Sequence, residues 1–456
     1  MKRTFTLFIL FLFVCSASYA QISFDKTYGT LADEEGNAVY QTWDGGYIMG
    51  DSKHLVKTSD SGIVEWSKPI PVSYVNITSD SGYIITHNNG DIDFTRVDQL
   101  GNIIWTTTYS LGLWAREAHS IEETSDGGYI VGGRFQDFSG SGMMLLKLNA
   151  TGAVSWRKTF MEPTSAAWCY GQSVHQTPDG GYILAGYTRI NHGLITIHKD
   201  IYVVKTDNAG NTQWIKNIGG PAEEYGYDLQ FTADGNYIIA GSQYDSTTSN
   251  YNMYLLKIDT AGNTIWSQSY AGVNSSEARS VWQTNDGGYI MAGRNFTGLW
   301  KGEDIVIRKV DALGNSLWTK VFGGNHDDRG NDIQQTKDGG YIITGRTESK
   351  GAGAEDAFLI KLDENGALGF PLAIAETNVY TDFMLYPNPS KGIVYIEVAQ
   401  SNTSIRVVTL QGKEVLSQKL MQGKNALIVD ELAKGIYLYQ MTSLAGVTQQ
   451  GKFMIQ

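Results

Sequence analysis

Asn285-Asp286-Gly287-Gly288-Tyr289-Ile290-Met291-Ala292 is a tight turn followed by a short apolar run, and its central pattern recurs along the chain. In each copy an Asp is followed by two small or polar residues, at least one of them Gly, and then by Tyr and an apolar run. The copies begin at Asp44, Asp80, Asp126, Asp179, Asp234, Asp286 and Asp338. Their spacings of 36, 46, 53, 55, 52 and 52 residues match a four-stranded propeller blade rather than a helical or leucine-rich repeat. The sequence therefore predicts seven repeated β-units.

The sixth repeat illustrates how one unit supplies four strands. We expect strands over 280–284 and 289–292 around the first turn, and over 305–310 and 317–322 around a second turn at 311–315. Alternating apolar residues with high β-branched content suit half-buried strands, and Gly supplies the positive φ that tight hairpins need. The fourth strand carries a Trp in six of the seven repeats, at Trp66, Trp105, Trp156, Trp214, Trp266 and Trp318.

The seventh repeat lacks this Trp strand, and the missing piece lies at the other end of the chain. Residues 22–29 match 317–323, with Phe24 in the place of Trp318. An N-terminal strand that completes the last repeat would close a ring and remove an open sheet edge. The predicted fold class is therefore all-β. We expect a seven-bladed β-propeller with four-stranded blades, its last blade closed by the N-terminal strand, followed by a small C-terminal β-sandwich.

The N-terminal residues have the pattern of an export signal. Lys2 and Arg3 precede an apolar run over 7–14, and Ser18-Tyr19-Ala20 provides small residues before the expected cleavage site. We expect a signal peptide at 1–20, a propeller at 21–370, a linker at 371–380 and a C-terminal domain at 381–456. No later stretch approaches the 18 apolar residues of a membrane-spanning helix, so no transmembrane segment is expected.

Charge and cysteine content narrow the classes of partner. The formal net charge of −12 becomes −14 once Lys2 and Arg3 leave with the signal, which disfavours nucleic acid or an anionic membrane as a partner. Cys169 would then be the single thiol, which excludes an intramolecular disulfide. We expect a monomeric propeller without a cofactor.

The last seventy or so residues combine several turn and strand motifs. These are Tyr386-Pro387-Asn388-Pro389 with Gly392, then 412–415, 432–437 and 451–455, among alternating segments at 394–398, 405–409, 426–429 and 436–441. This combination resembles the C-terminal sorting domain of the type IX secretion system of Bacteroidetes, although Gln411 stands in a turn where that family often has a nearby Asp. The resemblance implies the secretion machinery as a partner and delivery through the periplasm to the outer cell surface or the medium. An ordinary accessory β-sandwich is the alternative. The implied sorting-motif residues are Tyr386, Pro387, Asn388, Pro389, Gly392, Gly435, Tyr437 and Lys452.

The repeats themselves resemble the DGGY-type propeller repeats of secreted bacterial proteins, and more distantly quinoprotein propeller repeats. This likeness covers residues 22–370 and supports the fold rather than an activity.

Ligand-binding candidates lie on one predicted face. The connections from second to third strand, and from fourth strand to the next repeat, vary in length and emerge together, and such loops on a rigid scaffold are where binding sites concentrate. Aromatic rings there could stack on a glycan or peptide while polar groups accept hydrogen bonds. The alternative is that each of these residues is a solvated loop charge or a packing aromatic. The candidates are Arg116, His119, Trp168, Tyr170, Glu224, Tyr225, Arg279 and Asp328.

Two further patterns allow chemical or structural interpretations. Glu224 and Asp328 occupy equivalent places in the fifth and seventh repeats and could form the carboxylate pair of a glycosidase. The aspartates of the second turn offer too few oxygens for calcium and suit turn capping. A basic residue precedes that turn in all seven third strands, which suggests a structural ion pair or a solvated strand end, and histidine spacing indicates no metal site. The basic residues are Lys57, Arg96, Lys147, Lys205, Lys257, Lys309 and Lys361.

The sequence thus favours an exported, cell-surface or secreted binding module for a glycan, a peptide or a surface protein. An extracellular carbohydrate-active hydrolase and a structural envelope protein without a small ligand are the alternatives, and catalysis is the less favoured of the possibilities.

Overall fold

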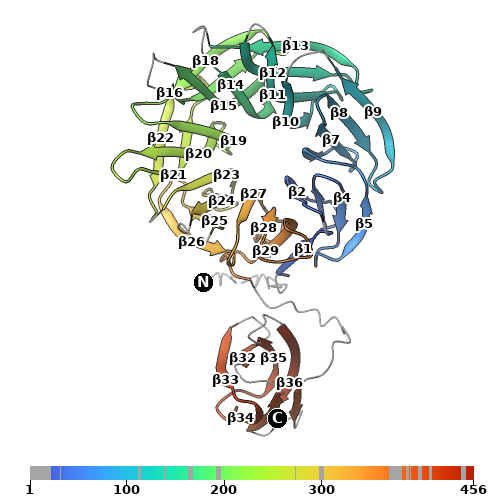
Figure 1. Cartoon of the computed structure of the whole chain (residues 1–456), viewed down its shortest axis with the longest axis vertical. Helices are drawn as coiled ribbons and strands as arrows, with labels where there is room; N and C mark the ends of the chain where they lie inside the picture. The colour runs from blue at the N-terminus through green and yellow to red at the C-terminus, as the bar shows by residue number, and fades with distance from the viewer. Residues whose placement is uncertain are drawn as a thin grey trace, which may run out of the picture. The chain divides into compact units, whose positions relative to one another are not determined.

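The chain folds into a ring of small antiparallel sheets and a separate C-terminal β-domain (Figure 1). The ring is one compact unit, Ser23–Leu368, and the C-terminal domain lies in another, which includes Gly369–Gln456. The computed structural model describes residues 22–30, 32–110, 115–137, 140–162, 168–191, 197–272, 274–296 and 302–368, and, in the C-terminal domain, 383–386, 390, 392–398, 403–409, 413–442 and 448–455. The expected signal peptide and linker lie outside the described residues.

Seven four-stranded antiparallel groups, here called blades 1 to 7, make up the described part of the ring. Blade 1 contains β2 (Ala38–Gln41), β3 (Tyr47–Gly50), β4 (Leu55–Thr58) and β5 (Val64–Lys68). Blade 2 contains β6 (Tyr74–Ile77), β7 (Tyr83–Asn88), β8 (Ile92–Val97) and β9 (Ile103–Tyr109). Blades 3 and 4 contain β10 (Ala115–Glu123), β11 (Tyr129–Asp137), β12 (Gly140–Leu148) and β13 (Val154–Phe160), and β14 (Trp168–Gln176), β15 (Tyr182–Asn191), β17 (Ile201–Thr206) and β18 (Thr212–Ile218), with β16 (Ile197–His198) beside β15.

Blades 5, 6 and 7 complete the ring. Blade 5 contains β19 (Glu224–Phe231), β20 (Tyr237–Asp245), β21 (Asn250–Ile258) and β22 (Thr264–Tyr270). Blade 6 contains β23 (Ser276–Gln283), β24 (Tyr289–Phe296), β25 (Glu303–Val310) and β26 (Ser316–Phe322). Blade 7 contains β27 (Asp328–Gln335), β28 (Tyr341–Thr347), β29 (Asp356–Leu362) and β1 (Phe24–Tyr28). Blades 3 and 4 are also joined by one parallel pair, Ser141 with Trp168. The all-β propeller expected from the sequence is confirmed. The strands of blade 6 extend beyond the predicted ones, because β23 begins at Ser276 and β24 continues to Phe296.

The N-terminal strand closes the ring as the sequence predicted. β1 pairs antiparallel with β29, from Phe24 opposite Lys361 to Tyr28 opposite Ala357. The strand therefore covers the edge that β29 would otherwise leave open.

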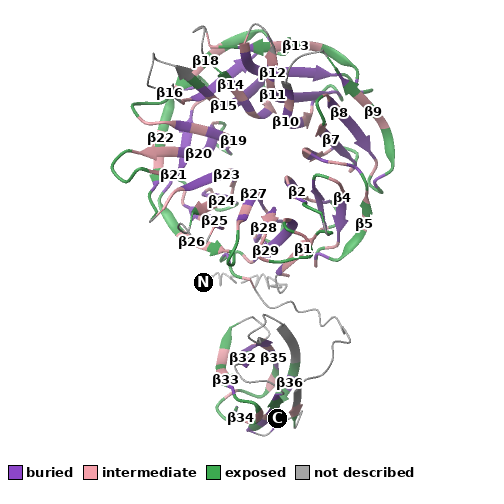
Figure 2. Cartoon of the chain, viewed as in Figure 1, coloured by how far each residue is buried: buried purple, intermediate pink, exposed green. Residues whose placement is uncertain are grey.

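Neighbouring blades are joined by a repeated aromatic contact. The fourth-strand Trp of one blade packs against the Tyr that follows the first turn of the next blade, as Trp105 does with Tyr129 at 5.8 Å between ring centroids. The same indole lies over the second-turn Gly of that next blade. A side-chain carbon added at Gly366 would lie 2.6 Å from the Trp318 ring, and its φ of 71° also favours glycine. Buried residues accordingly concentrate in the middle strands and exposed ones on the outer strands (Figure 2).

The first turn of each repeat is held by a conserved set of contacts. In blade 6, Thr284 donates to Asp286 at 2.6 Å, the Gly288 N–H donates to the same carboxylate at 3.0 Å, and the buried Lys309 ammonium lies 2.9 Å from it. The predicted structural ion pair is confirmed in all seven blades. The pairs are Lys57–Asp44, Arg96–Asp80, Lys147–Asp126, Lys205–Asp179, Lys257–Asp234, Lys309–Asp286 and Lys361–Asp338. The second-turn aspartates cap their turns, as Asp311 does by accepting from the N–H groups of Leu313 and Asn315.

The C-terminal domain is built from two sheets around one apolar core. One sheet has the order β30 (Phe383–Tyr386), β31 (Ile393–Val398), β34 (Gly423–Ile428), and the other β33 (Glu414–Leu420), β32 (Thr403–Thr409), β35 (Gly435–Thr442), β36 (Thr448–Ile455). Val394 and Leu427 from the first sheet share this core with Val407, Tyr439 and Phe453 from the second. This is the small sandwich that the sequence predicted.

The sorting-motif residues lie at strand ends and turns of this sandwich. Tyr386 ends β30, Gly392 precedes β31 and Gly435 begins β35. The Tyr437 hydroxyl donates to the Ala433 carbonyl at 2.8 Å, and Lys452 is exposed on β36. Pro387, Asn388 and Pro389 lie outside the described residues. In the described part of the chain no helix is long and apolar enough to cross a bilayer.

Candidate functional site

The innermost strands of blades 3 to 7 each contain a β-bulge near their beginning. The register of β10 shifts between Ala118 and Ser120, so that His119 has no direct partner on β11. The same shift occurs in β14, β19, β23 and β27. A bulge re-aims the extra side chain. The extra residues are His119, Gln172, Tyr227, Arg279 and Asn331.

These residues surround a cavity at the centre of the ring. Its volume is about 220 Å³, and all seven blades contribute to its wall. Each blade places there the residue seven positions before its first-turn Asp, as Arg279 precedes Asp286. Each innermost strand begins directly after the connection from the preceding blade, so its beginning lies on the face of the variable connections. The seven residues are Asn37, Ser73, His119, Gln172, Tyr227, Arg279 and Asn331.

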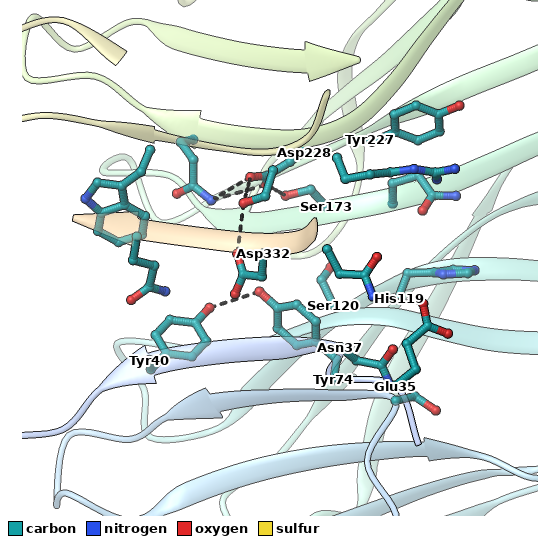
Figure 3. A pocket seen from close by; sticks show the side chains of 18 residues that line it. Glu35, Asn37, Tyr40, Tyr74, His119, Ser120, Ser173, Tyr227, Asp228 and Asp332 are labelled. Atoms are coloured by element: carbon teal, nitrogen blue, oxygen red, sulfur yellow. Dashed lines mark hydrogen bonds between the residues drawn. The ribbon is translucent and has the colours of Figure 1, made fainter. Parts of the chain in front are cut away.

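Inside the cavity, two carboxylates and two phenols lie close together (Figure 3). Ser280 lies between the carboxylates of Asp228 and Asp332, with its hydroxyl 3.3 Å from Asp228 and 2.8 Å from Asp332. The hydroxyls of Tyr40 and Tyr74 lie 2.9 Å apart. Burial, together with the nearby Asp228 carboxylate, raises the pKa of Asp332 to about 6.

The same carboxylates also fasten one blade to another. Asp332 of blade 7 accepts the Val39 N–H of blade 1 at 2.9 Å, and Asp228 of blade 5 accepts the Val281 N–H of blade 6 at 3.0 Å. Ser120 of blade 3 likewise accepts the Val174 N–H of blade 4 at 2.9 Å. The ring of small polar residues in the cavity therefore has a structural role, because it satisfies inner-strand N–H groups across the blade boundaries.

A group of six half-buried tyrosines adjoins the cavity, and we call it the tyrosine cluster. Tyr187 stacks on Tyr170 at 4.8 Å and meets Tyr225 edge-on at 4.9 Å between ring centroids. Tyr225 stacks on Tyr227 at 5.7 Å and contacts Tyr251 at 5.8 Å. Since Tyr227 also lines the cavity, the cluster and the cavity form one continuous surface. The six members are Tyr170, Tyr187, Tyr225, Tyr227, Tyr244 and Tyr251.

Three cations lie over rings of the tyrosine cluster. Arg134 lies over Tyr170 with its guanidinium carbon 5.1 Å from the ring centroid, Lys199 over Tyr225 at 4.8 Å, and Arg279 over Tyr227 at 4.2 Å. Such contacts fix the orientation of the rings.

Each of these cations is also paired with a carboxylate. Arg134 donates to both oxygens of Glu117 at 2.8 and 2.5 Å, Lys199 lies 2.9 Å from Glu223, and Arg279 lies 2.8 Å from Glu277. A hydrogen bond from His119, together with Arg134, lowers the pKa of Glu117 to about 2 despite partial burial. The charges around the tyrosine cluster therefore balance.

The structure brings four of the eight predicted site residues to this surface. Tyr170 and Tyr225 belong to the tyrosine cluster, His119 lines the cavity, and Arg279 lines the cavity and lies over the Tyr227 ring of the cluster. Trp168 is 38 % exposed on β14, where Arg189 lies over its ring at 6.0 Å. Arg116 is buried and pairs with Asp91 of blade 2, so it joins two blades and does not line the cavity.

The structure gives Glu224 and Asp328, the two carboxylates considered as a catalytic pair, structural partners. Both carboxylates are buried, and neither lines the central cavity. Glu224 accepts from the Gly220 N–H at 3.4 Å and from Gln243 at 3.0 Å, while Asp328 accepts from the Gly324 N–H at 2.9 Å and from Ser349 at 2.7 Å. Their equivalent positions reflect the same structural task, because each holds the connection that leads into its innermost strand.

Sequence reasoning missed most of the cavity wall and four of the six residues of the tyrosine cluster. The cavity-lining residue stands seven positions before the first-turn Asp in every repeat, so its position could have been found from the repeat pattern. It was hard to recognise because the residue type changes from blade to blade. Nothing in the sequence indicated that Tyr187 of β15 lies between Tyr170 and Tyr225. Among the described residues, no group of three or more His, Cys, Asp or Glu side chains is placed to hold a metal ion.

Comparison with known families identifies the C-terminal domain. Residues 384–456 match the family described as "Secretion system C-terminal sorting domain". The chain is thus a type IX secretion substrate, an exported propeller delivered to the cell surface or the extracellular space.

One curated relative matches part of the chain at low identity. The regulatory protein FlaEY of Caulobacter vibrioides is 23 % identical over 202 residues, which cover 39 % of this chain and 21 % of that protein. The chain therefore spans about a fifth of the length of this curated relative.

Solved structures of low similarity include PorZ of Porphyromonas gingivalis, described as a surface component of the type IX secretion system, at 10 % identity and a TM-score of 0.40 over 91 % of this chain and 64 % of that one. The Pan2 WD40 domain of Neurospora crassa is 12 % identical with a TM-score of 0.46 over 73 % and 90 % of the two chains. Likenesses of this degree carry no information about the ligand.

Proposed function

We propose that this exported propeller is a binding module. Its ligand occupies the mouth of the ring, by which we mean the central cavity together with the tyrosine cluster. The observation that carries the proposal is the continuity of the tyrosine cluster with the central cavity through Tyr227. Concave sites that combine aromatic rings with convergent polar groups are the usual form of a ligand site. A glycan, a peptide or an exposed segment of a surface protein could each use such a site.

The mouth is also preorganised. Tyr225 contacts three other rings of the cluster, and the Lys199 ammonium donates to its hydroxyl. Side chains that are already fixed lose little conformational freedom on binding. The rings therefore suit recognition more than they suit a chemical step.

Binding of the full chain without residues 1–20 to a mixed array of glycans and peptides tests this function. We expect retained ligands whose signal falls in Tyr225→Ala and Arg279→Ala but not in Gln99→Ala, an exposed residue in the second turn of blade 2. Circular dichroism of each variant reports whether the fold is intact. An array on which no ligand distinguishes the wild type from the two mouth variants would reject the binding function and favour the structural envelope role.

A further inference from the structure

We infer that the ligand of this mouth is a neutral carbohydrate, with its terminal sugar in the central cavity and the adjoining sugar against the tyrosine cluster. The inference rests on the proposed binding function and specifies the class of ligand.

Anionic ligands are disfavoured by the pairing of the cations. Recognition of a carboxylate or phosphate uses an arginine or lysine whose charge is available to the ligand. At this mouth Arg134 is engaged by both oxygens of Glu117, Lys199 by Glu223, and Arg279 by Glu277. The half-buried carboxylates of Asp228 and Asp332 in the cavity wall would also repel a negative group.

Cationic ligands meet the opposite difficulty. An ammonium group is recognised by the open faces of aromatic rings. Here Arg134 covers Tyr170 and Lys199 covers Tyr225, while Arg279 covers Tyr227. At these three rings a ligand cation would have to displace the protein's own cation and leave its carboxylate partner without a counter-charge.

The cavity wall is mainly polar. All eighteen lining residues carry a polar side-chain atom, and side-chain amides are supplied by blades 1, 4, 5 and 7. An amide both donates and accepts hydrogen bonds, as does a sugar hydroxyl. The Gln172 amide forms no hydrogen bond with another residue in the described parts of the chain. Such a wall suits a densely hydroxylated group better than the apolar side chain of a peptide.

The dimensions also fit one end of a chain. A cavity of about 220 Å³ has room for a sugar ring, which we assign to the end of the chain. The remaining sugars would then lie outside the cavity. Tyr227 lines the cavity (Figure 3), and it stacks on Tyr225, so the second sugar would meet aromatic faces and edges directly outside.

Isothermal titration of the full chain without residues 1–20 tests the ligand class. The probes are neutral oligosaccharides (maltotetraose, cellotetraose, mannotetraose and chitotetraose), acidic tetragalacturonate and cationic tetralysine. We expect binding of at least one neutral probe, with affinity unchanged between low and high salt because no charge is neutralised. Tyr225→Ala should weaken binding about 10-fold and Gln172→Ala about 5-fold, whereas Gln99→Ala should leave it unchanged.

The outcomes separate this inference from the function on which it rests. If tetragalacturonate, tetralysine or an array peptide binds in a manner sensitive to Tyr225→Ala while the neutral probes do not, the binding function stands and the neutral-carbohydrate inference is overturned. If neither these probes nor the array yields a ligand sensitive to the mouth variants, both fail. Since Gln172 lies at a bulge, its variant is accepted only when its melting temperature matches that of the wild type.

Discussion

Phe24 packs edge-on against Tyr47, with 5.9 Å between ring centroids and 63° between the ring planes. Trp318 meets Tyr341 at 5.9 Å and 65°, so the first described strand of the chain reproduces across the closure the contact that Trp makes between other blades. The ring therefore closes on an aromatic contact as well as on backbone hydrogen bonds.

Loss of the Phe24 ring should strongly destabilise the closure. Phe24→Ala removes a 93 % buried ring and should lower the free energy of unfolding by about 3 kcal/mol. Phe24→Trp, which restores the side chain found in the other repeats, should retain most of the stability. Calorimetric melting checks both, with Ile104→Ala on the exposed outer strand β9 as the control. A normal melting temperature for Phe24→Ala would contradict the closure argument.

Removing the carboxylate partner of a buried lysine should lower the free energy of unfolding more than removing a carboxylate at an exposed turn. The Lys361 side chain is 1 % exposed, and its ammonium lies 2.9 Å from Asp338. Asp338→Ala would leave this charge buried without its counter-ion, a loss of about 3 kcal/mol. Asp60→Ala, at an exposed turn, should have little effect in the same denaturant titration. Equal effects of the two substitutions would show that the ion pair does not stabilise the turn.

The stability contributed by Asp332 should depend on pH in the direction opposite to an ordinary ion-paired carboxylate. Its pKa is raised to about 6 in the folded ring, against about 4 in an unfolded chain. The folded state therefore holds the proton more tightly, so this contribution is complete below about pH 4 and is lost as the pH rises through about 6.

Comparison of unfolding free energies at several pH values measures this effect. The difference between wild type and Asp332→Asn should change by about 1–2 kcal/mol between pH 4 and 7, less than the full shift implies because the carboxylate also faces the cavity. A difference that is constant with pH would mean that Asp332 does not titrate in this range.

Glu224 and Asp328 should affect stability rather than ligand binding. Asp328→Ala removes the acceptor for the Gly324 N–H and for the hydroxyls of Ser349 and Thr347, and should cost about 2–4 kcal/mol. The milder Asp328→Asn should retain ligand affinity within about twofold. Asp33→Asn, at an exposed position before β2, is the matched control for both measurements. A selective loss of affinity without a loss of stability would return Asp328 to the binding site.

Much of the ring could be predicted because its signals are local. A turn Asp, its Gly and the following Tyr specify a hairpin wherever they occur, and the missing fourth strand of the last repeat could be recognised at 22–28 by its match to 317–323. The binding surface could be predicted less well from such local signals. Tyr170 and Tyr225 both lie in the tyrosine cluster, but Tyr187, which connects them, carries no local signal.

The sequence alone determined the propeller, its closure by Phe24 and the secretion domain, because each depends on patterns that short segments carry by themselves. Only the tertiary structure decided which polar residues face one another. The bulges turn His119, Gln172 and Arg279 toward the centre, and the curvature of the ring brings them together from different blades. The tertiary structure also placed Glu224 and Asp328 in buried hydrogen bonds, where neither lines the cavity. Side-chain direction at a bulge, and distance across a ring, are properties of the closed fold rather than of any one repeat.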